Sequence, residues 1–185
     1  MKKQIVLVIL FCTFSAAVAL AGEVAGVKMP DTITIEGKTL KLNGMGLRKK
    51  MLFKVYVAGL YVETPSKDAA KVISSDEVKS ITLNILRSLS GHQIGEAISD
   101  GFWHNSKAQM GALTDRLQKL TGMFPAVVEG DQIVLTYVPG KGTTVSAKGQ
   151  AKGVIEGKDF ADALFSVWLG ANPVQEDLKK ALLGG

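Results

Sequence analysis

The strongest constraint on the fold is the run from Met51 to Glu63, in which apolar residues occupy both alternating sets of positions. A strand that alternates buries one face, whereas a strand that is apolar on both faces has to be covered on both. This run is therefore predicted to be a central strand of a sheet. Gly59, within it, indicates a bulge or a close backbone approach. The two sets are Phe53, Val55, Val57 and Leu52, Tyr56, Leu60.

The segments around this run predict a largely antiparallel sheet with helices grouped between its strands. Strands joined by hairpins, with grouped helices, are typical of an α+β domain. The chain has neither a βαβ series nor a glycine-rich phosphate loop. The predicted strands are 32–35, 39–42, 51–63, 79–86, 133–138, 143–148 and 153–155. The predicted helices are 66–73, 90–122 with a break near 104–106, one that ends at Gly170, and one that starts at Asp177.

The helix before Gly170 has a broad apolar face. Phe160, Leu164 and Trp168 recur at i, i+4 and i+8. This spacing places all three side chains on one side of a helix. Pro173 follows as a stop signal. We therefore expect an amphipathic helix that docks on the sheet.

The N-terminus has the features of a cleavable export signal. Lys2 and Lys3 precede an apolar stretch that ends in the small-x-small sequence Ala19-Leu20-Ala21. The alternative is a membrane anchor, but a run of about 17 apolar residues is at the short end for a span, and no basic stop follows it. We expect a signal peptide over residues 1–21 and a single domain over residues 22–185.

Loss of this leader changes which chemistry the domain can use. It removes Cys12, the one cysteine, so the exported domain has no disulfide or thiol. Of 22 basic residues, the two lysines of the leader are lost, which leaves 20 against 17 acidic residues and a net charge of +3. This small charge gives no support to nucleic-acid binding. With only two histidines, His92 and His104, and no Gly-x-Ser-x-Gly elbow, we expect no metal, no cofactor and no nucleophilic triad.

A group of basic and aromatic residues around the central strand is the best candidate site. If the chain is extended from Arg48 onwards, then Arg48, Lys54 and Tyr56 face one way. A cation and a phenol at an apolar cleft can clamp an anionic head group or polarise a carbonyl. The alternative is that Lys49 and Lys50 are solvated and the tyrosine packs with its hydroxyl at the rim.

Several separated blocks carry the most distinctive residues of the chain: Gly46–Arg48, Lys54–Val62, Leu83–Arg87, Gly91–Gln93, Gly101–Asn105, Gly130–Gly140 and Asp159–Gly170. In content and order these blocks resemble the chalcone isomerase-like family, and within it the bacterial, exported branch. The resemblance implies the family's open-faced β-sandwich, in which a large antiparallel sheet is covered by a helical layer. It also implies a periplasmic location.

The resemblance further implies a ligand site. In the family's isomerases an arginine ahead of the long strand and a threonine within it hold the ligand; Arg48 matches the arginine, and Tyr56 takes the place of the threonine. Fatty-acid-binding relatives use an arginine and a tyrosine in this region, so the pair favours a carboxylate ligand. Arg87 lies near a lysine position of the family, and Ser166 near a Ser/Thr position that contacts ligand.

Two polar groups of the isomerases are missing from the chain. Ile94 stands where the isomerases have a tyrosine, and Gly101 where they have an asparagine. Isoleucine cannot donate a hydrogen bond to a ketone oxygen, and the loss of such a donor typically costs a factor of about 10² or more in rate. The isomerase machinery is therefore incomplete.

These observations predict a non-catalytic binder of a small amphipathic carboxylate such as a fatty acid. Arg48 and Tyr56 would hold the head group, and the tail would lie between the sheet and helices that carry Ile94, Phe102 and Trp168. One alternative is an isomerase, or intramolecular lyase, that acts on an unsaturated ketone through Arg48, Tyr56 and Arg87. A second alternative is an envelope interaction module without a ligand. An open apolar pocket lined by Arg48 would count against this second alternative.

Overall fold

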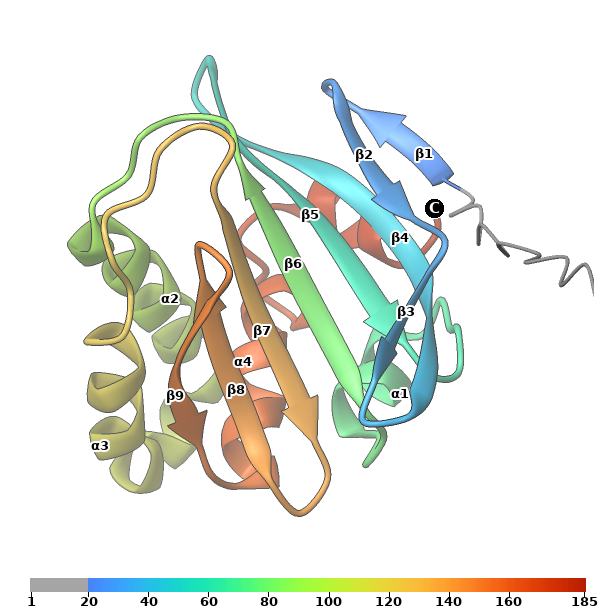
Figure 1. The fold of residues 1–185 in the computed structure, drawn as a ribbon. Helices are drawn as coiled ribbons and strands as arrows, with labels where there is room; N and C mark the ends of the chain where they lie inside the picture. The colour runs from blue at the N-terminus through green and yellow to red at the C-terminus, as the bar shows by residue number, and fades with distance from the viewer. Residues whose placement is uncertain (1–19) are drawn as a thin grey trace, which may run out of the picture.

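The computed structural model describes residues 20–185 and shows a curled, seven-stranded antiparallel sheet (Figure 1). The strand order is β3-β4-β5-β6-β7-β8-β9, so strands that follow one another in the chain are neighbours within this sheet. The predicted α+β class and antiparallel sheet are confirmed. The strands are β1 (Leu20–Val24), β2 (Val27–Pro30), β3 (Thr32–Ile35), β4 (Lys38–Lys50), β5 (Phe53–Val62), β6 (Lys79–Ile85), β7 (Gln132–Val138), β8 (Gly142–Ala147) and β9 (Gln150–Ile155).

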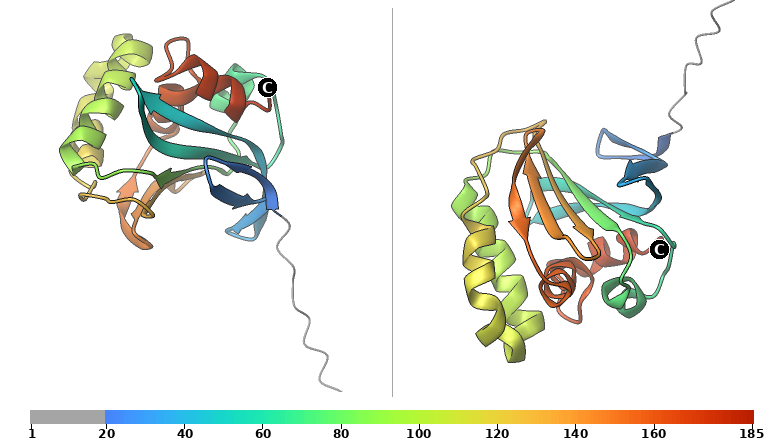
Figure 2. Two further views of the ribbon diagram at one scale, coloured as in Figure 1. Left: turned by 90° about the horizontal axis from the view of Figure 1, so that it is seen from above. Right: turned by 60° about the horizontal axis from the view of Figure 1, so that its bottom comes forward.

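The helices cover one face of this sheet, and a separate β1–β2 hairpin lies on the other side (Figure 2). None of the helices between residues 20 and 185 has the length and apolar character that a membrane crossing requires. The export signal predicted for residues 1–21 lies almost entirely outside the described residues and stays a prediction. The helices are α1 (Ala69–Ser74), α2 (Gly91–Ser106), α3 (Met110–Thr121), α4 (Lys158–Leu169) and α5 (Glu176–Leu182), with a 3₁₀ turn at Lys107–Gln109 between α2 and α3.

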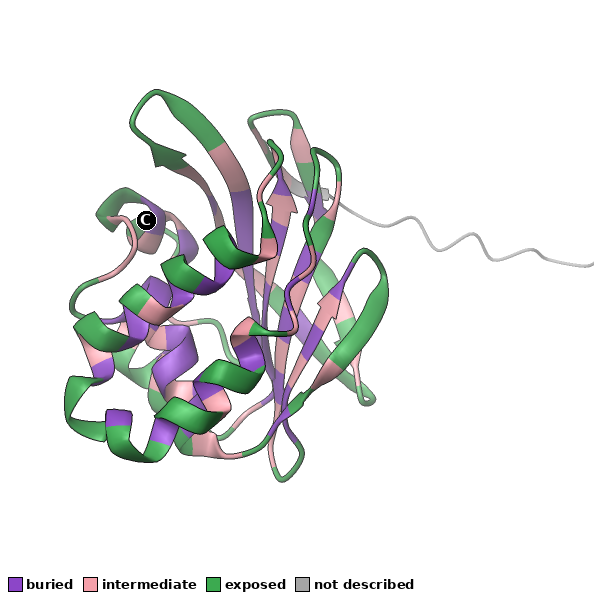
Figure 3. Cartoon of the chain, turned by 90° about the vertical axis from the view of Figure 1, so that its left-hand side faces the viewer, coloured by how far each residue is buried: buried purple, intermediate pink, exposed green. Residues whose placement is uncertain are grey.

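The central strand predicted from residues 51–63 is β5, which has β4 on one side and β6 on the other. One of its faces contributes Leu60 to a cross-strand row with Ile81, Leu135 and Val145, all at most 1% exposed, within the main core. The buried residues of this core come from both the sheet and the helices, as the colouring of Figure 3 shows. The apolar character of both faces is thus explained, because the opposite face of β5 is covered as well.

The β1–β2 hairpin provides part of that second cover. A Cβ atom at Gly59 would lie 3.1 Å from the Met29 Cε atom, so the glycine makes room for this side chain. The Tyr61 hydroxyl donates a hydrogen bond to the Pro30 carbonyl at 3.0 Å. The bulge or close backbone approach predicted at Gly59 is wrong: Gly59 pairs regularly with Met45 and Thr82, and the close approach comes from a side chain. The hairpin itself was not predicted from the sequence.

The predicted run differs from the structure at its start. The chain turns at Met51 and Leu52, so Arg48 belongs to β4 and Tyr56 to β5. The prediction that Arg48 and Tyr56 lie on one extended segment is therefore wrong. The turn is tight, with Lys50 paired to Phe53 across it. Apolar residues continue through this turn, which is why the sequence pattern did not reveal it.

The predicted helices are confirmed, including the break in the 90–122 segment. Ser90 and Gln93 form a capping box at the start of α2: the Ser90 Oγ accepts from the Gln93 backbone NH at 3.1 Å, and the Gln93 Oε1 accepts from the Ser90 NH at 2.9 Å. Reciprocal caps of this kind satisfy two otherwise unpaired backbone donors. In α4, Phe160, Leu164 and Trp168 are buried, as an amphipathic helix docked on the sheet requires.

Lys79 is an exception to the apolar core. Its side chain is 1% exposed, and its ammonium group donates to the carbonyls of Val72 at 2.9 Å and Ser75 at 3.0 Å, at the end of α1. Burial lowers the pKa of Lys79 to about 8, although the Asp162 carboxylate, 3.8 Å away, partly opposes this effect. The folded protein therefore holds a charged amine in a site that favours the neutral form.

This pKa predicts a pH dependence of stability. Between about pH 8 and the ordinary lysine pKa of 10.5, the unfolded chain binds more protons at Lys79 than the folded chain does. The free energy of unfolding therefore rises with pH across this interval, by roughly 3 kcal/mol from this group. Below pH 8 both states are protonated and the contribution is constant.

The measurement is denaturant unfolding from pH 7 to 10.5 of the wild-type protein and of the Lys79→Met variant. Methionine keeps the length of the side chain and removes its titration. We expect the variant to be less stable, with a deficit that grows as the pH rises. The tyrosines titrate in both proteins, so the difference isolates Lys79. Parallel curves would contradict the assignment.

Candidate functional site

Arg48 and Tyr56 lie directly opposite each other on paired antiparallel strands. Directly opposed residues of an antiparallel pair have their side chains next to each other on the same face of the sheet. That face is the one covered by helices, since Tyr56 packs against the main core. The register shifts between Arg48 and Lys49, so that Lys49 pairs with Lys54 and Val55 has no partner on β4. The two predicted residues are thus brought together by strand pairing.

Tyr56 is anchored by α4. The Trp168 indole Nε1 donates a hydrogen bond to the Tyr56 hydroxyl at 3.0 Å. Burial raises the pKa of Tyr56, while the bond from Trp168 and the positive charge of Arg48 lower it in part. The phenol is therefore neutral at physiological pH. Because its oxygen accepts from Trp168, its own proton is available for a ligand.

Arg48 is held by the residue before α5. Its Nη1 donates to the Gln175 Oε1 at 3.3 Å and to the Lys49 carbonyl. Gln175 also accepts from the Lys49 NH at 2.9 Å and donates to the Leu47 carbonyl at 3.2 Å. Both bonds of Arg48 use Nη1, which leaves the rest of the guanidinium edge for a ligand. Gln175 therefore fixes the end of β4 and the direction of the arginine.

Two glycines allow α5 to take this position. Gly46 lies on the helix side of β4, where an added Cβ atom would lie 2.7 Å from the Ala181 Cβ and 2.9 Å from the Leu178 Cδ1. A Cβ atom added at Gly44 would be similarly close to the carbonyl oxygen of Leu182. A larger residue at either position would push α5, and Gln175 with it, away from the strand.

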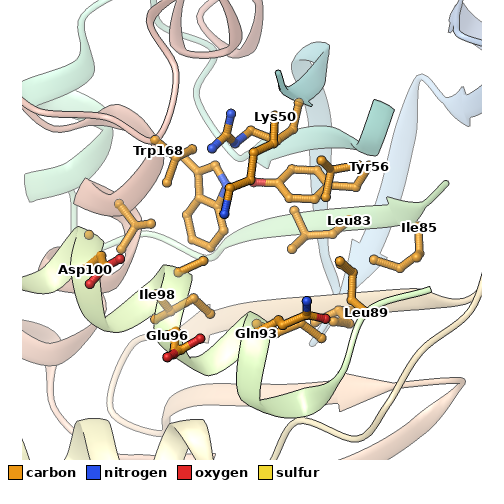
Figure 4. Close-up of a pocket in the computed structure, with 18 of the residues that line it drawn as sticks. Lys50, Tyr56, Leu83, Ile85, Leu89, Gln93, Glu96, Ile98, Asp100 and Trp168 are labelled. Carbon is orange, nitrogen blue, oxygen red and sulfur yellow. The ribbon is translucent and has the colours of Figure 1, made fainter. Parts of the chain in front are cut away.

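An open cleft of about 780 Å³ extends from this pair between the sheet and α2 (Figure 4). Its volume is in the range of small-molecule binding sites. Most of the lining is apolar and comes from β5, β6, β7, α2, α4 and the segment before α5. The apolar lining residues are Met51, Phe53, Val55, Leu83, Ile85, Leu89, Ile94, Ala97, Ile98, Ile133, Val167, Trp168, Pro173 and Val174.

The charges of the cleft are separated. The cations Arg48, Lys50 and Arg87 come from the strands and the loop after β6, whereas Glu96 and Asp100 come from α2. Figure 4 shows Lys50 near Tyr56 and Trp168, with Glu96 and Asp100 on the helix across the cleft. An anionic group is therefore favoured at the strand side and disfavoured at the helix side.

Five residues predicted for the site line this cleft. They are Arg48, Tyr56, Arg87, Ile94 and Trp168. The Arg87 guanidinium lies 4.5 Å from the centre of the Phe53 ring, a cation–π contact at the cleft. His92, by contrast, is 80% exposed at the start of α2 and pairs with Glu96 at 3.3 Å.

The other two predicted residues lie outside the cleft. Phe102 is fully buried and packs against Phe160, with ring centres 5.2 Å apart, so it belongs to the core. Ser166 donates to the Asp162 carbonyl at 2.7 Å and lines a separate hollow beside α1. It precedes Trp168 by two positions, which turns it to the far side of α4, since each helical residue advances about 100°.

The sequence prediction missed several lining residues. Leu83 and Ile85 had a usable signal, because they share a face on the predicted strand at 79–86. Lys50, solvated in the alternative interpretation, is exposed, but on β4 it lies two residues from Arg48 and so also shares the face of the cleft. Glu96 and Asp100 had no signal, because their position depends on how α2 is rotated against the sheet.

The comparisons with known proteins agree with this fold. The model of the family described as chalcone isomerase-like matches residues 21–184. Among solved structures, the crystal structure of a fatty-acid binding protein from Arabidopsis thaliana is similar, with a TM-score of 0.68 and 19% identity. The likeness covers 85% of this chain and 92% of that chain. No curated protein matches.

The bond between Trp168 and Tyr56 predicts a stability effect. In Tyr56→Phe the buried indole NH loses its acceptor, and we expect the free energy of unfolding to fall by about 1–3 kcal/mol. The double variant Tyr56→Phe/Trp168→Phe removes donor and acceptor together and should cost less than the sum of the single changes. Urea unfolding of the four proteins gives the coupling energy; strict additivity would show that the bond contributes nothing.

Proposed function

The chain belongs to the chalcone isomerase-like family, and we propose that it is a non-catalytic binding protein for a fatty acid or a similar amphipathic carboxylate. The observation that carries this proposal is the position of Arg48 and Tyr56, side by side at the edge of a large apolar cleft. The structural likeness to a fatty-acid binding protein supports it.

The head group would be held at the strand side of the cleft. A carboxylate oxygen can accept from the Tyr56 hydroxyl, whose oxygen is already bonded to Trp168, and from the free edge of the Arg48 guanidinium. Lys50 adds positive charge on the same face. A charge-assisted contact of this kind contributes about 1.5–3 kcal/mol.

The tail would lie against the apolar lining between β6 and α2, where Leu83, Ile85 and Ile98 are buried. Each buried methylene contributes about 0.8 kcal/mol before the costs of binding are subtracted. A long chain therefore contributes more than the head group does. Affinity would come mainly from the tail, and orientation and specificity from Arg48 and Tyr56.

We also propose that the protein acts after export, in the periplasm. The basic start, apolar stretch and small-x-small site of residues 1–21 support this proposal. It predicts a mature chain that starts at Gly22, which intact mass measurement of the protein from its native host would show. A mature chain that keeps residues 1–21 would contradict it.

The isomerase alternative lacks a polar group where it needs one. Ile94 and Gly101 both line the cleft, and neither side chain can donate a hydrogen bond to a ketone. We therefore expect chalcone cyclisation at the uncatalysed rate when the purified protein is added. Acceleration that is lost in Arg48→Ala would instead favour the isomerase.

The interaction-module alternative is also disfavoured. A protein that uses this fold without a ligand has no need of an open apolar cleft. Here the cleft is not filled by its own side chains, and it is lined by Arg48.

The decisive test is fatty-acid binding to Arg48→Ala in solution. We expect palmitate to bind the variant roughly 10- to 150-fold more weakly, because the charge-assisted contact is lost. The methyl ester of palmitate has no carboxylate, so its affinity should be nearly the same for the two proteins.

Lys54→Ala is the matched control, since Lys54 carries the same charge near Arg48 but does not line the cleft. It should bind palmitate as the wild-type protein does. Equal palmitate affinity of wild type and Arg48→Ala would refute the head-group site.

A further inference from the structure

The turn between β4 and β5 exposes a contiguous apolar tip. Met51 is 89% exposed, Leu52 96% and Phe53 58%. In Figure 1 this hairpin extends beyond the neighbouring strands, and its tip stands clear of the other elements. Adjacent exposed apolar residues of this size are uncommon on a soluble surface unless they bind something.

The backbone conformation of the tip makes an apolar residue at this turn more unusual. Met51 has φ 54°, in the left-handed region that favours glycine and asparagine. Two-residue hairpin turns normally place glycine or asparagine at such positions. A methionine here costs stability, and it exposes an apolar side chain as well. Neither property helps folding, so both point to a role for the tip in binding.

Basic residues surround the tip. Lys49 and Lys50 precede it and Lys54 follows it, and all three are exposed. Within residues 20–185, none of these lysines takes part in an ion pair. An apolar tip flanked by such lysines matches a bilayer interface, where apolar groups enter the acyl boundary and lysines meet lipid phosphates.

We propose that the tip of the β4–β5 hairpin docks on the surface of an anionic lipid bilayer. Leu52 and Met51 enter the acyl boundary, and Lys49 and Lys54 contact lipid phosphates. A protein partner would need a groove that receives the tip, with acidic groups placed around it. An anionic bilayer needs no such fit, because it offers an apolar layer beneath a layer of phosphates along its whole surface.

The docked tip lies at the opening of the cleft. Lys50, Met51 and Phe53 line the cleft as well as forming part of the hairpin. A lipid carboxylate that leaves the bilayer beside the tip would reach Arg48 and Tyr56 without crossing bulk water. This role in uptake rests on the proposed function, whereas docking itself depends only on the hairpin.

Vesicle co-sedimentation tests the docking. We expect the purified protein to bind vesicles of phosphatidylglycerol and phosphatidylcholine more tightly than vesicles of phosphatidylcholine alone, with a loss of binding at high salt. The variant Leu52→Asn should bind these vesicles at least about tenfold more weakly than the wild-type protein. Lys49→Gln/Lys54→Gln should lose about fivefold for each lysine.

The control is Val154→Ser, which removes an apolar side chain that is 41% exposed on β9, at the opposite edge of the sheet. It should bind vesicles as the wild-type protein does. All variants share the same N-terminus, so the leader does not affect the comparison. Equal binding to neutral and anionic vesicles, or unchanged binding of the hairpin variants, would overturn the proposal.

Palmitate binding without vesicles separates the two proposals. Leu52, Lys49 and Lys54 do not line the cleft, so their variants should bind palmitate in solution as the wild-type protein does. Loss of docking with normal palmitate binding in these variants supports a membrane-contacting tip. A protein that docks but does not bind palmitate would refute the proposed function and leave the docking site intact.

Discussion

The site depends on one constraint, the register between β4 and β5. Because Arg48 is paired with Tyr56, a cation and a phenol that are eight positions apart in the chain become neighbours on the helix side of the sheet. The same register puts Gly46 opposite Ala58, in the place where α5 packs. A shift of one residue would turn Arg48 to the other face and α5 would meet a side chain instead of a glycine. Head group, helix and cleft are therefore fixed together.

The two anchors of the site come from different parts of the fold. Trp168 reaches Tyr56 from α4, and Gln175 reaches Arg48 from the start of α5. The C-terminal segment therefore does more than cover the sheet, since it orients both polar groups of the cleft. This arrangement explains why the apolar face of α4 ends in a tryptophan, which combines a large apolar surface with a hydrogen-bond donor.

Much of the fold could be predicted because its elements carry strong local signals. The apolar faces of β5 and α4 are examples. The turn at Met51 could not be predicted, because its residues look like the strand that follows and lack the usual glycine or asparagine. Arg48 and Tyr56 were identified together, but the reason given, a shared parity on one strand, was wrong. Phe102 shows the general difficulty: its position on α2 is apolar in either case, and only packing against Phe160 makes it core.

The bond between Trp168 and Tyr56 also gives the protein an internal optical probe. The chain has two tryptophans: Trp168, buried against the cleft, and Trp103, 52% exposed on α2. A collisional quencher such as acrylamide reaches Trp103 readily and Trp168 poorly, so the unquenched emission comes mainly from the indole that contacts Tyr56. A ligand that accepts from the Tyr56 hydroxyl polarises the oxygen to which this indole donates. Occupancy of the cleft can thus be followed by tryptophan fluorescence, without a label and without altering any residue.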